Sequence, residues 1–234
     1  MFIGHFAVAF AAKRAAPRAS LGTLFLAAQW LDVLWPVLVL AGLEEVRVAP
    51  GDTAFTPLAF VRYPLTHSLA LALVWSAVLG GVYRWRTGRA REAWVVAGLV
   101  LSHWVLDLLT HRPDLPLAPG AAKVGLGLWN SVLGTLLVES ALFAAGVFLY
   151  ATFTRAVTRG GRIALWALVA TLAGLYAANV LGPPPPGPRA VAVAGLLMWL
   201  FLPWAIYVDR RREPTTTTHR QLTAGPRGLE STEG

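Results

Sequence analysis

The sequence predicts an all-α membrane protein: a polytopic bundle of about six transmembrane helices, preceded by a short N-terminal helix half-buried in the bundle. Three observations support this fold class. Hydrophobic residues make up 56% of the 234 residues and charged residues only 14%, against about 25% charged residues in soluble domains. Long apolar stretches recur at nearly the length that crosses a bilayer. The basic residues gather on one side of these stretches.

The short apolar segment 2–12 comes first, and it is too short to span, since 11 residues of helix cover about 16 Å. Lys13, Arg14 and Arg18 follow it and are expected at the cytoplasmic face. This order, apolar residues before charges, is the reverse of a signal peptide, so none is expected. The segment should therefore enter the bundle from the cytoplasmic side and carry His5 into the interior.

Six apolar stretches follow, each near the ~20 residues that span about 30 Å of hydrocarbon. They lie at roughly 20–43, 67–83, 92–110, 127–154, 162–182 and 190–208. The remainder leaves no room for a soluble domain, so we predict one transmembrane domain over residues 1–212. Residues 213–234 contain few apolar side chains and are predicted to form a disordered cytoplasmic tail, which includes His219.

Prolines mark the irregular points of the predicted bundle. Pro36 lies inside the first full span, where a missing backbone donor predicts a kink just beyond Asp32. The segment 182–188 contains five prolines and two glycines and is predicted to be a stiff, non-helical connector between the last two spans. The long, mixed loop 44–66 is a candidate cap over the outer face, or a simple connector.

The net charge of +8 reflects topology in this interpretation. With the N-terminus inside, 15 of the 20 Lys and Arg residues fall in cytoplasmic segments and 5 in outer loops, as the positive-inside rule requires. Both termini are then cytoplasmic. The expected partners are membrane lipids, including anionic ones, and no nucleic acid. The absence of cysteine excludes thiolate metal sites and disulfides.

Three ionisable residues lie four apart near the end of one apolar stretch: His103, Asp107 and His111. Four residues of helix turn through about 400°, so all three share one helix face. Ionisable groups at membrane depth are rare, face the bundle interior and tend to be functional. This stripe is therefore the first candidate for a functional site.

The depth of the ionisable residues indicates which of them meet. At about 1.5 Å per residue from the nearest cytoplasmic arginine, Asp32 lies near 21 Å and His103 near 18 Å. Asp107 lies near 24 Å and His67 near 25 Å by the same count, while His5 lies near 12 Å above Lys13. Side chains from three helices thus reach one level in the outer half of the bilayer.

Imidazole and carboxylate groups together bind divalent metals, with Zn²⁺ expected before Mn²⁺ or Fe²⁺. His67, His103 and Asp107 are the predicted ligands, and His5 and Asp32 complete or orient the site. Asp32 is also a candidate general base. Ser68 is a candidate catalytic hydroxyl, although an N-terminal cap of the following helix is the commoner role for such a serine.

Plainer roles remain open for several of these residues. A lone intramembrane histidine such as His5 can simply hydrogen-bond a neighbouring helix. His111 lies at a helix end, where it forms the rim of the site or satisfies terminal carbonyls. Arg62 and Arg112 lie at the same outer edge, where they could hold an anionic head group or only flank a helix. Two further buried polar residues have no spacing argument: Glu139 and Asn179.

The motifs resemble those of a membrane-bound, metal-dependent hydrolase family. They are Gly4-His5, Leu31-Asp32, Thr66-His67-Ser68 and Ser102-His103 followed by Asp107. The family pattern has a GH start, a PDxD-like segment, HRGxTHS and SHxxxD, and the order agrees over about residues 1–125. The resemblance implies an inner-membrane location, a divalent metal and a hydrolytic role, and it carries over to His5, Asp32, His67, His103 and Asp107.

The chain departs from that pattern at two places. Arg62-Tyr63-Pro64 stands where the family has His-Arg-Gly, and Leu34 stands where a second acid is expected after Asp32. The leading hypothesis is a hydrolase with one divalent metal that acts on an amphiphilic, lipid-like ester or phosphoester. The alternatives are a proton- or metal-linked transporter and a catalytically inactive scaffold. The sequence leaves the oligomeric state open.

Overall fold

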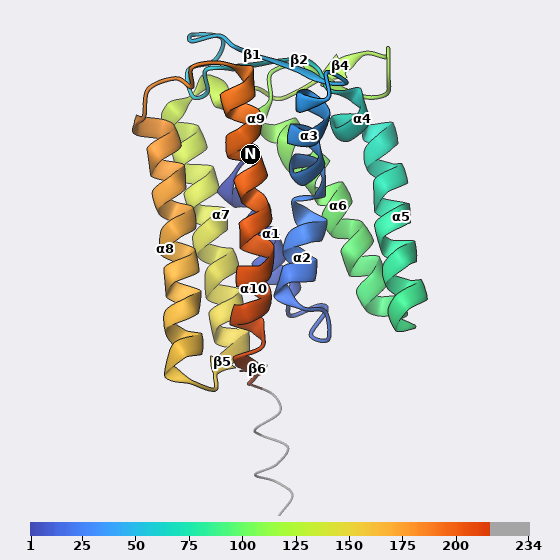
Figure 1. Cartoon of the computed structure of the whole chain (residues 1–234), viewed down its shortest axis with the longest axis vertical. Coiled ribbons are helices and arrows are strands. Elements are labelled where there is room, and N and C mark those ends of the chain that lie inside the picture. Colours follow the sequence, from blue (N-terminus) through green and yellow to red (C-terminus); the bar gives the residue numbers. More distant parts are fainter. Residues whose placement is uncertain (216–234) are drawn as a thin grey trace, which may run out of the picture.

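The computed structural model describes residues 1–215 as a helical bundle with short strand pairs at both ends (Figure 1). The principal helices are α1 (Ile3–Ala12), α2 (Leu21–Ala28), α3 (Trp30–Leu40), α5 (Leu69–Thr87), α6 (Ala90–Thr110), α7 (Val132–Phe153), α8 (Arg159–Leu181), α9 (Pro188–Leu196) and α10 (Phe201–Asp209). The 3₁₀ turn η2 (Leu197–Leu200) joins α9 to α10. Most of the predicted tail, with His219, lies outside the described residues.

Four helical segments are long and apolar enough to cross a membrane: α6, α7, α8 and the continuous unit Pro188–Asp209. The pair α2 and α3 passes the same test as one broken span, which gives up to five within residues 1–215. The chain is therefore compatible with an integral membrane protein, but the predicted six spans are not confirmed. The difference is α5, whose 19 residues end in a last turn that carries Arg84 and Arg86.

The first broken span bends at a place that the sequence did not predict. α2 and α3 meet at an angle of 57°, and the break falls at Gln29, which caps the end of one helix and the start of the next. Pro36 lies inside α3 without interrupting it. The predicted kink just beyond Asp32 was therefore misplaced, because the break lies before Asp32.

Helix α1 lies inside the bundle, as predicted, and not on its surface (Figure 1). Its residues His5, Phe6 and Phe10 are at most 1% exposed. It packs closely on α7, where Gly146 makes room, since a Cβ there would lie only 2.2 Å from the carbonyl oxygen of Ala7. This close approach brings the first turn of α1 to the level of the ionisable residues of α6.

Short elements close one end of the bundle, which we call the capped end. Strands β1 (Glu45–Val48) and β2 (Leu58–Arg62) form an antiparallel hairpin, followed by the single-turn helix α4 (Pro64–His67). Strands β3 (Leu115–Pro116) and β4 (Lys123–Val124) pair nearby, before the turn η1 (Leu128–Asn130). At the opposite end, β5 (Thr154–Ala156) pairs with β6 (Arg212–Pro214). The loop 44–66 is therefore a structured cap.

Candidate metal centre

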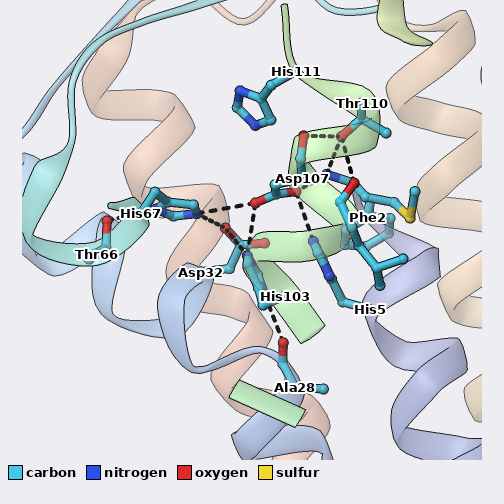
Figure 2. Close-up of polar contacts among 12 residues, drawn as sticks. Phe2, His5, Ala28, Asp32, Thr66, His67, His103, Asp107, Thr110 and His111 are labelled. Atoms are coloured by element: carbon cyan, nitrogen blue, oxygen red, sulfur yellow. Dashed lines mark hydrogen bonds and ion pairs between the residues drawn. The ribbon is translucent and has the colours of Figure 1, made fainter. Parts of the chain in front are cut away.

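Five side chains that the sequence singled out converge near the capped end of the bundle, and Figure 2 shows them together. We call this group the His/Asp cluster; it consists of His5, Asp32, His67, His103 and Asp107. They come from α1, α3, α4 and α6. Four of the five residues are at most 3% exposed, while the side chain of Asp32 is 22% exposed. The prediction that these residues meet is consistent with this geometry.

Asp107 stands at the centre of the His/Asp cluster. Its Oδ2 lies 3.2 Å from Nε2 of His103 and 3.7 Å from Nε2 of His67. Its Oδ1 lies 3.2 Å from Nε2 of His5 and accepts a hydrogen bond of 2.7 Å from the N-terminal amine of Met1. Each oxygen of this buried carboxylate thus has two nitrogen atoms as neighbours.

Asp32 supplies the second carboxylate of the cluster. Its Oδ1 lies 3.3 Å from Nε2 of His67 and 3.7 Å from Nε2 of His103. Both imidazoles therefore direct the same ring nitrogen, Nε2, toward the space between Asp32 and Asp107. Figure 2 shows His67 and His103 pointing into this space from two sides.

The protonation of His103 is set by the break between α2 and α3. Its Nδ1 lies 2.7 Å from the carbonyl oxygen of Ala28, one of the terminal carbonyls of α2, which have no helical donor. A carbonyl oxygen only accepts hydrogen bonds, so Nδ1 must donate. In the neutral ring, Nε2 then carries the lone pair and faces the two carboxylates.

The protonation of His67 is set by a chain of two side chains. Thr66 Oγ1 donates its only proton to Oε2 of Glu44 over 2.7 Å. The same oxygen lies 2.7 Å from Nδ1 of His67, so Nδ1 must donate to it. Glu44 is held in turn by the backbone amides of Leu65 and Thr66. The neutral ring of His67 therefore also presents its Nε2 lone pair to the cluster.

The donor set fits a divalent metal. Two imidazole lone pairs and two carboxylates converge in a space closed to most solvent, where a cation or bound protons between them would stabilise the arrangement. Two overlapping groups have ligand atoms within 4.8 Å of one another: His5 with His103 and Asp107, and Asp32 with His67 and His103. Because both groups use Nε2 of His103, the set favours one ion over two.

His5 occupies one side of this space. Its ring stacks on that of His103, with centroids 3.6 Å apart and planes at 5°. Its Nδ1 is buried without a hydrogen-bond partner among the described residues. The polar contact that holds the ring in place is therefore the one between Nε2 and Asp107.

Two of the predicted rim residues, His111 and Arg112, belong to a separate hydrogen-bond network. His111 Nδ1 lies 2.8 Å from Oδ1 of Asp114, which also accepts a hydrogen bond from the Tyr63 hydroxyl. Arg112 pairs with Asp52 and Asp114. Burial by itself would raise the pKa of Asp114, but the hydrogen bonds and charges of these neighbours hold it below its ordinary value. Arg112 is therefore engaged within the protein.

Two other predicted residues lie apart from the cluster. Arg62 is exposed and donates to the carbonyl of Gly42. Ser68 Oγ donates to the carbonyl of Pro64 and accepts from the amide of Leu71, so it caps the N-terminus of α5. The capping role that sequence reasoning had weighed against a catalytic one is thus present in the structure.

Residues that sequence reasoning missed or left open surround the cluster. Glu44 is one of several charged residues in the long loop 44–66. Nothing in the neighbouring sequence indicates that its side chain folds back onto Thr66. Glu139 on α7 is fully buried and accepts from the amides of Phe2 and Gly4, while its Oε1 has no partner among the described residues. The signal for Glu139 in the sequence is that an ionisable residue lies inside an apolar span.

A cavity of about 630 Å³ adjoins the cluster. The carboxylate and histidine side chains that line it are Asp32, His67, Asp107, His111 and Glu139, and we call this part of the cavity its polar end. His103 is not among the lining residues, so it would hold a metal from behind. Asn179 also lines the cavity, on the wall formed by the end of α8.

Comparisons of the chain with protein-family models, with curated proteins and with solved structures find no match.

Proposed function

We propose that the protein is a membrane hydrolase that uses one divalent metal, with zinc expected before manganese or iron, and acts on an amphiphilic ester or phosphoester. One observation carries the proposal. His67 and His103 each have Nδ1 committed to an acceptor, so both Nε2 lone pairs face the carboxylates of Asp32 and Asp107. A buried arrangement of this kind is stable only with a cation or bound protons at its centre.

The residues divide into two roles by their position relative to the cavity. His103 holds the metal from the buried side, and His67 and Asp107 hold it from the cavity side. A metal in this place would act as a Lewis acid and activate water near neutral pH. Asp32 borders the cavity and is the more exposed of the two carboxylates, so it is suited to orient water or accept its proton.

Metal analysis tests the proposal directly. Purified wild type, His103→Ala and the neighbouring control Ser102→Ala would be compared by elemental analysis. Ser102 donates only to the carbonyl of Leu99 on its own helix, so its variant should retain the metal. We expect about one divalent metal ion per chain in wild type and in Ser102→Ala. The metal content of His103→Ala should be much lower. Equal metal in all three, or none in any, would contradict the proposal.

Hydrolysis is tested on the metal-loaded protein with fluorogenic acyl esters and phosphoesters. Turnover that is abolished in His103→Ala and reduced more than 100-fold in Asp32→Asn is the expected result. Bound metal with no turnover on any ester would instead favour transport, which vesicle uptake of zinc would reveal. Bound metal with neither activity would favour an inactive scaffold.

A further inference from the structure

The cavity beside the His/Asp cluster has a long apolar wall as well as its polar end. Its apolar lining includes Leu175 and Val180 of α8, Val191 of α9, and Leu197 and Met198. Four aromatic residues also line it: Trp35, Phe55, Phe60 and Trp129. The cavity is therefore amphiphilic, with its reactive groups gathered at one end.

The apolar wall reaches the surface of the bundle. Leu175 is 43% exposed and Leu197 is 58% exposed, although both line the cavity. They belong to α8 and to the unit Pro188–Asp209, both of which qualify as membrane spans. Exposed leucines on membrane spans face hydrocarbon. The cavity thus opens between these two spans toward the lipid, in the outer half of the bilayer.

The two spans pack together through α10 and part along α9. α8 packs against α10, whereas α9 is seated on α3, where Gly195 touches the ring of Pro36. Trp199 donates from Nε1 to the carbonyl of Val33 and fixes η2 to α3 as well. Residues 182–187 of the proline-rich connector join α8 to α9 without helical structure, and Pro188, predicted to belong to the connector, is the first residue of α9. A polyproline stretch is extended and stiff, so it keeps the two helix ends apart.

The charge of the lining limits what the cavity can take. Within residues 1–215, no Lys or Arg side chain lines it, while Asp32, Asp107 and Glu139 do. Arg112, the nearest candidate for an anionic head group, is occupied by Asp52 and Asp114. Even with the proposed divalent metal in the cluster and the N-terminal amine on Asp107, these three carboxylates leave no excess positive charge for a phosphate, so an uncharged head group is favoured.

We propose that the cavity takes a single-chain, uncharged lipid ester from the bilayer through the opening between α8 and α9. The acyl chain lies along Leu175, Val180 and Leu197, and the ester group lies at the polar end, where the proposed metal rather than the carboxylates would face its carbonyl oxygen. A volume of about 630 Å³ lies within the range that encloses one small ligand. The hydrolytic step rests on the proposed function: one water is consumed, the acyl C–O bond breaks, and a fatty acid and an alcohol leave.

Photolabelling of the protein in phosphatidylcholine nanodiscs tests the binding step without any need for turnover. The probe is a monoacylglycerol with a diazirine in mid-chain, and a matched probe carries the same chain on a phosphate. We expect the uncharged probe to label peptides from 175–180 and 191–198, at least 5-fold more strongly than the phosphate probe. Excess unlabelled monoacylglycerol should suppress this labelling.

Two neighbouring alanines of α8 provide a matched pair of variants. Ala178 lines the cavity, whereas Ala177 is exposed and does not line it. Ala178→Trp should lower labelling at least 5-fold by filling the opening, and Ala177→Trp should leave it within 2-fold. Metal content, measured on the same samples, should stay unchanged in both and reports that the bundle is intact.

The outcomes separate the two proposals. Equal labelling in Ala178→Trp and Ala177→Trp, or labelling spread evenly over lipid-facing helices, overturns the chain site while the metal centre stands. Stronger labelling by the phosphate probe overturns the uncharged head group. Loss of metal in His103→Ala with no change in hydrolysis would defeat the proposed function, while labelling at 175–180 and 191–198 would still support the chain site.

Discussion

At the scale of single residues, the site depends on two hydrogen bonds whose acceptors, Thr66 and Ala28, are not among the residues that line the cavity. Nδ1 of His67 donates to Thr66, and Nδ1 of His103 donates to the carbonyl of Ala28. Acceptors of this kind fix the tautomer and the orientation of metal-binding histidines. Thr66 also holds Glu44, so the outer cap is connected to the cluster through a single hydroxyl.

Removing that hydroxyl should weaken the metal site. In Thr66→Val, Nδ1 of His67 loses its acceptor, and we expect zinc affinity to fall by about 10–100-fold. Isothermal titration of the metal-free protein measures it. Thr66→Ser keeps the hydroxyl and should bind within a few-fold of wild type. Equal affinities in all three proteins would show that the tautomer of His67 does not depend on Thr66.

The rim network should give the protein a pH-dependent contribution to stability. The pKa of Asp114 is lowered in the folded state, so its contribution is present above the unfolded value of about 3.9. It is lost as the pH falls through the folded pKa. The thermal midpoint of Asp114→Asn should lie below that of wild type at pH 6–7, and the gap should begin to narrow below about pH 4 and close once the pH is below the lowered folded pKa. A gap independent of pH would contradict this role.

Much of the His/Asp cluster could be predicted from the sequence, because ionisable residues in apolar spans are few and helix rise fixes their depth. Asp32, His67, His103 and Asp107 were placed at one level by counting alone. The partners that set the tautomers could not be predicted in this way. Ala28 contributes only a backbone carbonyl, and Glu44 folds back from a loop whose path depends on tertiary contacts.

At the scale of elements, the position of α1 decides whether His5 reaches the cluster. Its buried course was predicted from its length and from the basic residues that follow it, but the means of its packing was not. The contact with α7 depends on Gly146, where backbone approaches backbone. A single glycine in a span has no sequence signature that distinguishes close packing from simple tolerance.

Filling this contact should displace α1. In Gly146→Ala, the added Cβ would lie 2.2 Å from the carbonyl oxygen of Ala7, so we expect a loss of about 1–3 kcal/mol in the free energy of unfolding. Gly174 on α8 has open space around it, and Gly174→Ala should be neutral or slightly stabilising. Denaturant unfolding compares the two variants, and equal losses would contradict the close-packing argument.

At the scale of the whole molecule, the open question is the number of membrane crossings. The prediction from charge placed both termini in the cytoplasm, and that requires α5 to cross. α5 runs alongside α6 and packs against it along its length (Figure 1). α5 is less hydrophobic than the four candidate spans because its last turn carries Arg84 and Arg86. In the predicted topology these two arginines would lie at the cytoplasmic face.

Reporter insertion at three loops tests the topology. A reporter at Gly88, in the turn after α5, should be cytoplasmic, and reporters at Gly51 and Gly120 should lie outside. All three glycines have positive φ in exposed loops or turns, so insertion there disturbs little packing. Gly88 on the same side as Gly51 would mean that α5 does not cross, and the predicted orientation of the C-terminus would reverse.

Metal removal should loosen the bundle as a whole, because the His/Asp cluster around the proposed metal joins α1, α3, α4 and α6. A ligand that binds only the folded state at about 100 times its dissociation constant adds about 2.7 kcal/mol. Chelation should therefore lower the thermal midpoint of wild type by several degrees and leave that of His103→Ala unchanged. An equal shift in both would indicate an effect of the chelator elsewhere.

The break between α2 and α3 bears on how this protein could be stabilised. A straight helix over 21–40 would gain backbone hydrogen bonds, and selection for heat resistance would favour substitutions near Gln29 that close the gap. Closing it would return the carbonyl of Ala28 to the helix and leave Nδ1 of His103 without its acceptor. Variants selected for stability alone should therefore include some that lose function. In these variants the carbonyl oxygen of Ala28 would accept a helical hydrogen bond instead of the one from His103.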